Sequence, residues 1–156
     1  MISRRTFLAQ TAGLAAGFAA GRSWALAGPV VAAPLVTIYK SPTCGCCAKW
    51  VDHVKAAGFQ TVVHDRENME EVKDWLGVPK DVRSCHTAQV DRYLLEGHVP
   101  ASDVQRLLRE RPKLMGLAVP GMPASAPGMD EPGKPHEAYE VLAFQSSGAT
   151  QSFAKH

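Results

Sequence analysis

Hydrophobic and polar positions alternate in short segments of the chain, and glycines or prolines separate these segments. Residues 35–40 and 59–65 are rich in β-branched side chains and alternate in polarity, which predicts two strands. Residues 48–58 between them have helical spacing and end in glycine, which predicts a helix. Because strand, helix and strand follow one another, we expect a βαβ unit with parallel strands and a right-handed crossover.

The pattern after this unit predicts a second helix, a hairpin and a third helix. Residues 68–77 begin with an asparagine N-cap, carry acids in the first turn and end in glycine, as a short helix does. Residues 87–98 predict an antiparallel hairpin, and residues 100–111 predict a helix that ends before a proline. Helical spacing from apolar neighbours predicts that Trp50 and Trp75 belong to the core.

The composition changes in the last third of the chain. Proline, glycine and alanine dominate residues 112–135, so no helix is expected there and we predict a long loop that displays its methionines. Residues 137–144 predict a strand, and a turn and a weaker strand to Phe153 follow it. The chain therefore ends in a strand or a hairpin.

Three of the four cysteines lie within four positions, directly after the first predicted strand. Cys44, Cys46 and Cys47 stand in the sequence Ser-Pro-Thr-Cys-Gly-Cys-Cys at the entrance to the first helix. Unpaired N–H groups and the helix dipole favour thiolate there, so these sulfurs should titrate below the free-thiol value of about 8.5. Cys85 follows in a predicted loop, next to His86. Thiolates of this kind either attack disulfides or bind soft metals.

A cysteine pair at the first strand-to-helix turn, within this order of elements, resembles the thioredoxin and glutaredoxin fold. We therefore expect an α/β, thioredoxin-like domain (βαβ, helix, β-hairpin, helix) with a long Pro/Gly/Met-rich loop and a C-terminal strand or hairpin. Those families place a cis-proline before the third core strand, where this chain has Ser-Cys-His-Thr at 84–87. If the topology holds, Cys85 takes the place of that proline beside the cysteine turn.

The first 27 residues are predicted to be a twin-arginine signal peptide, with a Sec signal or an uncleaved anchor as the alternative. An apolar stretch rich in alanine and glycine leads to a small-residue cleavage site near Ala27, and it is short and glycine-broken for a membrane span. Cleavage would leave a periplasmic protein with no membrane span. The twin-arginine pattern itself is formed by Ser3, Arg4, Arg5, Phe7 and Leu8.

Removal of residues 1–27 changes the charge of the chain. It removes three arginines and no acid, so the formal net charge falls from +2 to about −1. The basic balance of the precursor is therefore no argument for nucleic-acid binding, and no Lys/Arg cluster with interleaved aromatics occurs in the sequence. Residues 28–34 predict a flexible lead-in, and residues 35–156 have the length of one domain.

A metal site explains the cysteines better than a dithiol alone. Cys44 and Cys47 form a CxxC pair, but Cys46 would divert mixed disulfides. Adjacent cysteines suit bridging Cu(I) better than tetrahedral zinc, whose structural sites prefer cysteines two to four residues apart. The trio with Cys85 therefore predicts a copper site rather than a zinc site. Candidate additional ligands are His86, Met122 and Met129.

Four blocks of sequence resemble the CopG-like periplasmic copper-resistance and metal-binding proteins, a family long catalogued as a domain of unknown function. The blocks are residues 40–47, 84–87, 96–100 and 116–123, and the resemblance covers residues 35–145. The resemblance implies a thioredoxin-like domain that binds Cu(I) as a thiolate-bridged multinuclear cluster on the four cysteines, in bacterial copper handling.

Three functions stay open at this stage. The first is a Cu(I)-binding protein that sequesters periplasmic copper, exchanges it with donor or acceptor proteins, or cycles it between Cu(I) and Cu(II). The second is a thiol–disulfide oxidoreductase in which Cys44 is the nucleophile and Cys47 the resolving thiol. The third is a structural domain stapled by Cys44–Cys47 and Cys46–Cys85 disulfides. The sequence favours metal binding and leaves open whether the protein is an enzyme.

Overall fold

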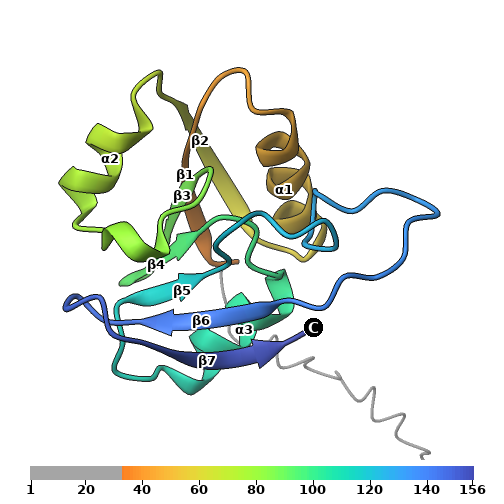
Figure 1. Cartoon of the computed structure of the whole chain (residues 1–156). Helices are drawn as coiled ribbons and strands as arrows, with labels where there is room; N and C mark the ends of the chain where they lie inside the picture. The colour runs from red at the N-terminus through yellow and green to blue at the C-terminus, as the bar shows by residue number, and fades with distance from the viewer. Residues whose placement is uncertain (1–32) are drawn as a thin grey trace, which may run out of the picture. The chain divides into compact units, whose positions relative to one another are not determined.

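The computed structural model describes residues 33–156, so the predicted signal peptide and most of the predicted lead-in lie outside the described residues. None of the described helices is long and apolar enough to cross a membrane. The elements, shown in Figure 1, are β1 (Leu35–Lys40), α1 (Gly45–Ala56), β2 (Gln60–Asp65), α2 (Met69–Leu76), the 3₁₀ turn η1 (Lys80–Val82), β3 (Thr87–Val90), β4 (Tyr93–Glu96), α3 (Ala101–Glu110), β5 (Gly116–Ala118), β6 (Glu140–Phe144) and β7 (Thr150–Lys155).

The strands form one mixed sheet in the order β2-β1-β3-β4-β5-β6-β7. β1 and β2 are parallel on either side of α1, as the βαβ pattern predicts, and β3 and β4 form the predicted antiparallel hairpin. β4 and β5 are again parallel and are joined through α3, while β6 and β7 form a C-terminal antiparallel pair. The predicted α/β class is confirmed, and the narrower thioredoxin-like assignment stays a prediction.

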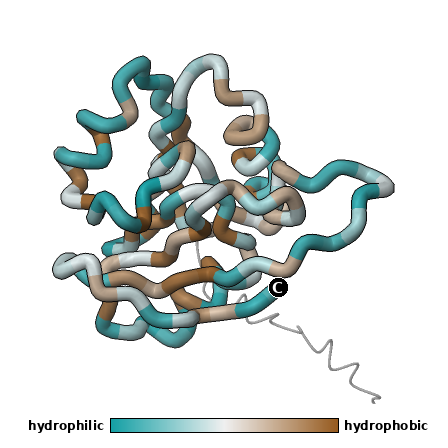
Figure 2. The backbone as a smooth tube through the Cα atoms, in the orientation of Figure 1, coloured by the Kyte–Doolittle hydropathy of each residue, from teal (hydrophilic) through white to brown (hydrophobic). Residues whose placement is uncertain are grey.

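Strand register divides the core between the two faces of the sheet. Ile38, Ala88, Leu95 and Leu117 are register partners in turn from β1 to β5, and they belong to the main core together with residues of α1 and α3. The alternate positions Leu94, Ala118 and Phe144 form a smaller cluster with Leu76 of α2. Side chains alternate across a strand, so α2 covers the opposite face from α1 and α3. Figure 2 shows the apolar residues concentrated along these central strands.

Local signals place α2 as predicted. The Asn68 side chain accepts a hydrogen bond from the backbone N–H of Glu71 at 3.2 Å, and Gly77 ends the helix with φ +71°. A side-chain oxygen at the N-cap satisfies an N–H group that has no helical partner, and glycine tolerates the left-handed conformation at the helix end. These two residues therefore fix the length of α2.

Two predicted boundaries were wrong. Helix α1 begins at Gly45, three residues before the predicted start, so Cys46 and Cys47 lie within its first turn. The predicted loop at 112–135 is interrupted by β5, which is completely buried between β4 and β6. A strand of three residues has too few positions to show alternation, and its pairing on both edges stabilises it despite the neighbouring prolines and glycines.

Candidate metal centre

The N-terminus of α1 brings three sulfur atoms together. Pro42 restricts the turn after β1, and the extended backbone of Cys44 forms the N-cap without a side-chain hydrogen bond or an acid in the first turn. The first N–H groups of the helix therefore face the cysteines and favour negative charge there. Cys44 and Cys47 form a disulfide, and the Sγ atom of Cys46 lies 3.5 Å from that of Cys44.

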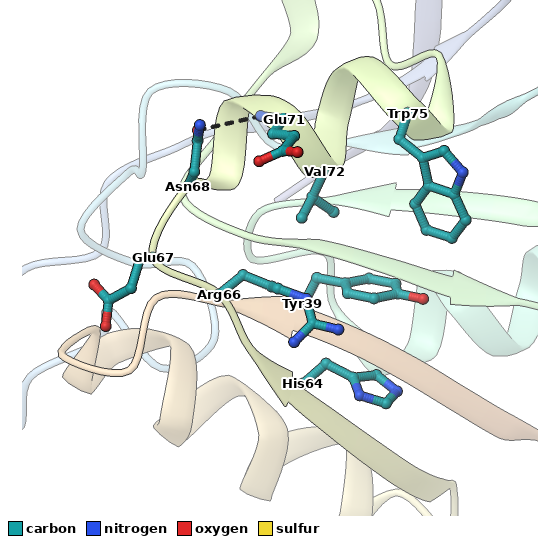
Figure 3. A pocket seen from close by; sticks show the side chains of 8 residues that line it. All are labelled: Tyr39, His64, Arg66, Glu67, Asn68, Glu71, Val72 and Trp75. Atoms are coloured by element: carbon teal, nitrogen blue, oxygen red, sulfur yellow. Dashed lines mark hydrogen bonds between the residues drawn. The ribbon is translucent and has the colours of Figure 1, made fainter.

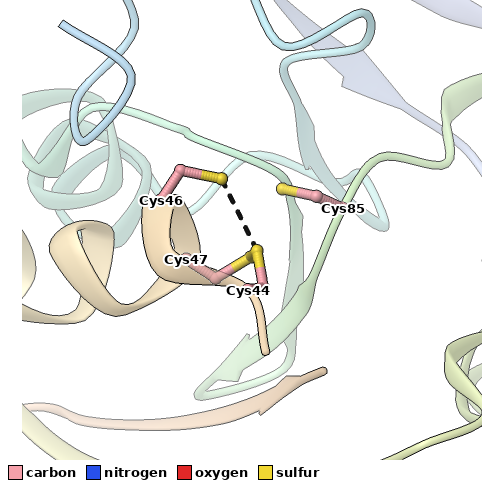
Figure 4. Close-up of side chains that lie close together, drawn as sticks. All are labelled: Cys44, Cys46, Cys47 and Cys85. Atoms are coloured by element: carbon pink, nitrogen blue, oxygen red, sulfur yellow. Dashed lines mark hydrogen bonds between the residues drawn. A yellow bond between two sulfur atoms is a disulfide. The ribbon is translucent and has the colours of Figure 1, made fainter. Parts of the chain in front are cut away.

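The fourth cysteine lies directly opposite this turn. Cys85 is carried by the loop between η1 and β3, and its Sγ atom points at the trio in Figure 4. The four Sγ atoms lie within 4.8 Å of one another. Within the described residues, Cys46 and Cys85 are free thiols and both are half-buried. The topology thus gathers four potential soft ligands from two segments that are about forty residues apart in sequence.

Two buried histidines extend this cluster on the side of Cys85. The Nε2 atom of His98 lies 3.1 Å from Cys85 Sγ, and the Nδ1 atom of His86 lies 3.2 Å from the same sulfur. Cys47, Cys85, His86 and His98 also hold their potential ligand atoms within 4.8 Å of one another. The cluster therefore offers a mixed sulfur and nitrogen set beside the four-sulfur set.

Hydrogen bonding fixes the protonation of these rings. The Nδ1 atom of His98 lies 2.7 Å from the carbonyl oxygen of Pro127, which can only accept, so Nδ1 carries the proton and Nε2 has a free lone pair. The thiol of Cys85 donates to that lone pair, and His86 then donates from Nδ1 to the same sulfur. His86 Nε2 is left as a buried acceptor with no hydrogen-bond partner among the described residues. A buried imidazole nitrogen without a hydrogen-bond partner is unusual, and on a ring whose other nitrogen contacts Cys85 it makes His86 a candidate metal ligand.

Burial sets the charge state of the ligands. It lowers the pKa of His86 well below its usual value, with His98 and Lys73 adding to the effect, and it lowers the pKa of His98. Burial, followed by the charge of Cys46, raises the pKa of Cys85 to about 11. In the metal-free protein the imidazoles are therefore neutral and the Cys85 thiol is protonated. A bound cation would have to displace that proton.

The structure separates the predicted additional ligands. His86 lies inside the cluster, where its ring centroid is 4.5 Å from that of Trp50. Met129 is partly buried and packs against the main core, whereas Met122 is 44% exposed in a left-handed turn with φ +49°. Met115, the third methionine of the predicted loop, packs on the smaller cluster beside β5. Ligation by His86, Met122 or Met129 stays a prediction.

His98 was not among the residues predicted for the site. The predicted hairpin already contained the signal, because Thr87 pairs with Glu96 and continuing the same register places residue 85 opposite residue 98. A histidine just beyond one strand therefore meets the cysteine just before the other. The adjoining Gly97 has φ +68° and allows the two segments to approach closely.

A separate cleft of about 520 Å³ lies on the α2 face of the sheet. Tyr39 stacks on His64 with 5.3 Å between ring centroids, and Trp75 meets Tyr39 edge-on at 6.1 Å. Trp75 is 71% exposed at this cleft, so its predicted core position was wrong. It lies at the edge of the buried face of a short helix whose buried residues are Val72 and Lys73. Figure 3 shows the lining residues, which include no cysteine.

Comparisons with known proteins agree with the sequence resemblance. Residues 82–129 match a family model described as "Protein of unknown function, DUF411". A solved structure of copper resistance protein CopG, form 2, is 41% identical, with a TM-score of 0.74, and the match covers 80% of this chain and 98% of that one. Form 1 is 42% identical, with a TM-score of 0.72, and the match covers 78% of this chain and 96% of that one. No curated protein matches the chain.

The family model covers Cys85, His86 and His98 but ends short of the cysteines at the start of α1, whereas the two solved structures match about four-fifths of this chain. With more than 40% identity over nearly the whole length of both solved structures, the match is far above a likeness of fold alone. The chain therefore belongs to the family of the copper resistance protein CopG.

Proposed function

We propose that this protein binds Cu(I) through Cys44, Cys46, Cys47 and Cys85, as a thiolate-bridged copper cluster, and contributes to copper resistance in the periplasm. The observation that carries the proposal is the approach of all four Sγ atoms to within 4.8 Å of one another. Membership of the CopG family supports copper as the metal. Export through the twin-arginine signal at 1–27, with cleavage near Ala27, is part of the same proposal.

The chemistry of the ligands favours Cu(I) over harder metals. Thiolates are soft ligands, and a thiolate can bridge two Cu(I) ions, which makes adjacent cysteines useful. The disulfide between Cys44 and Cys47 must first accept two electrons and two protons to provide two thiols. Metal binding then releases the protons from the thiols. The reduced protein is therefore the form that takes up Cu(I).

The disulfide form offers a different set of ligands. Cys46 and Cys85 keep free thiols, and the neutral rings of His86 and His98 lie beside them. A mixed set of imidazole and thiolate accommodates Cu(II) better than four thiolates do. Redox cycling between Cu(I) and Cu(II), or transfer to donor and acceptor proteins, is thus compatible with this site.

The test is an anaerobic Cu(I) titration of the reduced protein. We expect more than one copper per chain, and a substantial loss of bound copper in Cys85→Ser. Thr43→Ser, in the exposed turn before the cysteines, is the matched control and should bind copper normally. A wild-type stoichiometry of zero would end the proposal.

A thiol–disulfide oxidoreductase is the second candidate. The observation in its favour is the Cys44–Cys47 disulfide at a helix N-terminus, with Cys47 buried and Cys44 partly accessible for attack. An insulin-reduction assay separates the two candidates. Activity that survives both Cys46→Ser and Cys85→Ser would support the enzyme and leave the other two sulfurs without a role.

The stapled structural domain is tested by mass spectrometry of periplasmic material. It requires both a Cys44–Cys47 and a Cys46–Cys85 disulfide, whereas the structure contains the first bond and has Cys46 and Cys85 as free thiols. Detection of both bonds as fixed would favour this third function.

A further inference from the structure

A buried ion pair lies behind the loop that carries Cys85. Lys73 of α2 and Glu96 at the end of β4 are joined by a 2.8 Å contact from Nζ to Oε2, and their side chains are 2% and 0% exposed. The Nζ atom also donates to Thr87 Oγ1 at 2.8 Å, and Thr87 donates to the other oxygen of Glu96. Burying two charges has a large desolvation cost, so a fully buried pair is weak evidence for stabilisation alone.

The pair holds both ends of the Cys85–His86 dipeptide. Glu96 Oε2 accepts a hydrogen bond at 2.9 Å from the backbone N–H of Ser84, the residue just before Cys85. Thr87, the residue just after His86, is held by Lys73 and Glu96. The backbone N–H of Gly97 donates to the carbonyl of His86 at 2.9 Å, which ties the middle of the loop to the end of β4.

From this geometry we propose that Lys73 and Glu96 are positioning residues for the metal site, which hold Cys85 at the distance from the α1 cysteines that copper binding requires. The inference rests on the proposed Cu(I) binding. Neither residue reaches a sulfur, and both act through the backbone and Thr87. Groups that orient metal ligands in this way typically contribute tenfold to a hundredfold to metal affinity.

A second, exposed link joins α2 to the segment just before Cys85 and provides a matched control. Arg83, two residues before Cys85, contacts Glu70 at 2.6 Å and Asp74 at 2.5 Å on the outer side of α2. These carboxylates are 70% and 65% exposed, so each contact is worth little in water. If α2 only needed to be attached to the loop, loss of either link would change Cu(I) affinity to a similar extent.

The experiment compares Glu96→Gln with Asp74→Asn in the full reduced protein. Cu(I) affinity is measured by competition with the chelator bicinchoninate, and unfolding of the metal-free protein is measured by urea. We expect Glu96→Gln to lower Cu(I) affinity by about tenfold or more with the number of bound ions unchanged, and Asp74→Asn to leave affinity unchanged. Affinity in Glu96→Gln equal to wild type, or lowered equally in Asp74→Asn, would overturn the proposal.

Thr87 provides the variant that remains informative if Glu96→Gln does not fold. Thr87→Ser keeps the hydroxyl and should keep the affinity, whereas Thr87→Val keeps the shape, loses the hydroxyl and should weaken Cu(I) binding. Equal affinities for the two variants would count against the proposal.

Alkylation of Cys85 by iodoacetamide, compared with Cys46 in the same protein, separates this inference from the function. If wild type binds no Cu(I), the proposed function fails. The positioning role still predicts several-fold faster alkylation of Cys85 in Glu96→Gln, and an unchanged rate would refute it.

Discussion

His98 illustrates how a single residue can complete the site. Its ring is held at Nδ1 by the Pro127 carbonyl and presents Nε2 to Cys85, so the two nitrogens have separate roles. The Asn side chain can reproduce the Nδ1 donor but ends before the position of Nε2. We therefore expect His98→Asn to fold normally and to lower Cu(I) affinity by about tenfold.

The measurement for His98 is the same chelator competition on reduced protein. His64→Asn is the control, because His64 is a half-buried imidazole on the edge strand β2, away from the cysteines. Equal Cu(I) affinity in His98→Asn and wild type would show that His98 only packs against Cys85.

A second residue, His53, makes stability depend on pH. Its Nε2 atom accepts a hydrogen bond at 3.0 Å from the backbone N–H of Ala101 at the start of α3, so this bond needs the neutral ring. Burial lowers the pKa of His53, and Asp130 opposes the effect. The unfolded chain, with an ordinary pKa of about 6.5, takes up the proton first as pH falls. The stabilisation by this hydrogen bond is therefore fully present above the pKa of the unfolded chain. It is lost as pH falls through the lower pKa that His53 has in the folded protein.

We expect the free energy of unfolding to fall between pH 7.5 and pH 5.5, as measured by urea denaturation of the metal-free protein. His53→Gln keeps an acceptor for Ala101 but does not titrate. The free energy of unfolding of this variant should therefore fall less over the same pH interval. One proton bound preferentially by the unfolded chain gives a slope of at most about 1.4 kcal/mol per pH unit. The same pH dependence in His53→Gln and wild type would contradict this role.

At the scale of elements, the hairpin β3–β4 sets the geometry of the candidate metal centre. Gly97 follows β4 with φ +68°, and a Cβ atom there would lie 2.3 Å from Ser84 Oγ and 2.8 Å from the carbonyl oxygen of Val119. Gly97→Ala must therefore displace the Cys85 loop. Gly77 has a similar φ of +71°, but a Cβ atom there meets only Met115 Cε, at 3.6 Å.

The two glycines give a matched pair of variants. Both alanine substitutions should cost about 1 kcal/mol of stability, because a left-handed conformation is strained for alanine, and Gly97→Ala should cost more because its Cβ also clashes with Ser84 and Val119. Only Gly97→Ala should also lower Cu(I) affinity, as measured by chelator competition after urea unfolding has established the stability of each variant. Normal copper binding in Gly97→Ala would mean that the close packing of the loop is not needed by the site.

Elements with local signals were predictable from the sequence, and elements fixed by distant partners were not. The caps at Asn68 and Gly77 identify α2 because they satisfy the backbone of that helix alone. β5 is stabilised by its pairing with β4 and β6, and the sequence pattern of residues 116–118 does not predict that pairing. The cysteine trio was visible as a motif, whereas the buried Lys73–Glu96 pair is recognisable only once α2 is placed on the sheet.

At the scale of the whole molecule, the candidate metal centre gathers residues from segments that are far apart in the sequence. Cys44 caps α1, Cys46 and Cys47 lie in its first turn, and Cys85 belongs to the loop before β3. The His98 ring is held through Pro127 by the long segment after β5. A cluster bridged across these parts would act as a cross-link in the folded state and could not form in the unfolded chain. Copper should therefore stabilise the fold as a whole.

This stabilisation should depend on redox state. A ligand present at one hundred times its dissociation constant adds about 2.7 kcal/mol to the free energy of unfolding, which for a domain of this size raises the melting temperature by roughly 10 °C. We expect a shift of that size when Cu(I) is added anaerobically to the reduced protein, and its reversal by a strong Cu(I) chelator. The disulfide form has two sulfurs withdrawn from metal binding and should shift far less.

Cys85→Ser is the control that tests the cross-link itself. It keeps the three cysteines of α1, which can still hold copper locally, but it cannot connect α1 to the loop before β3. Its reduced form should therefore bind some Cu(I) while its melting temperature rises much less than that of wild type. If Cu(I) raised the melting temperature equally in reduced wild type, in the disulfide form and in Cys85→Ser, the stabilisation would come from metal bound elsewhere. The melting temperatures would then give no support to a copper cluster shared between α1 and Cys85.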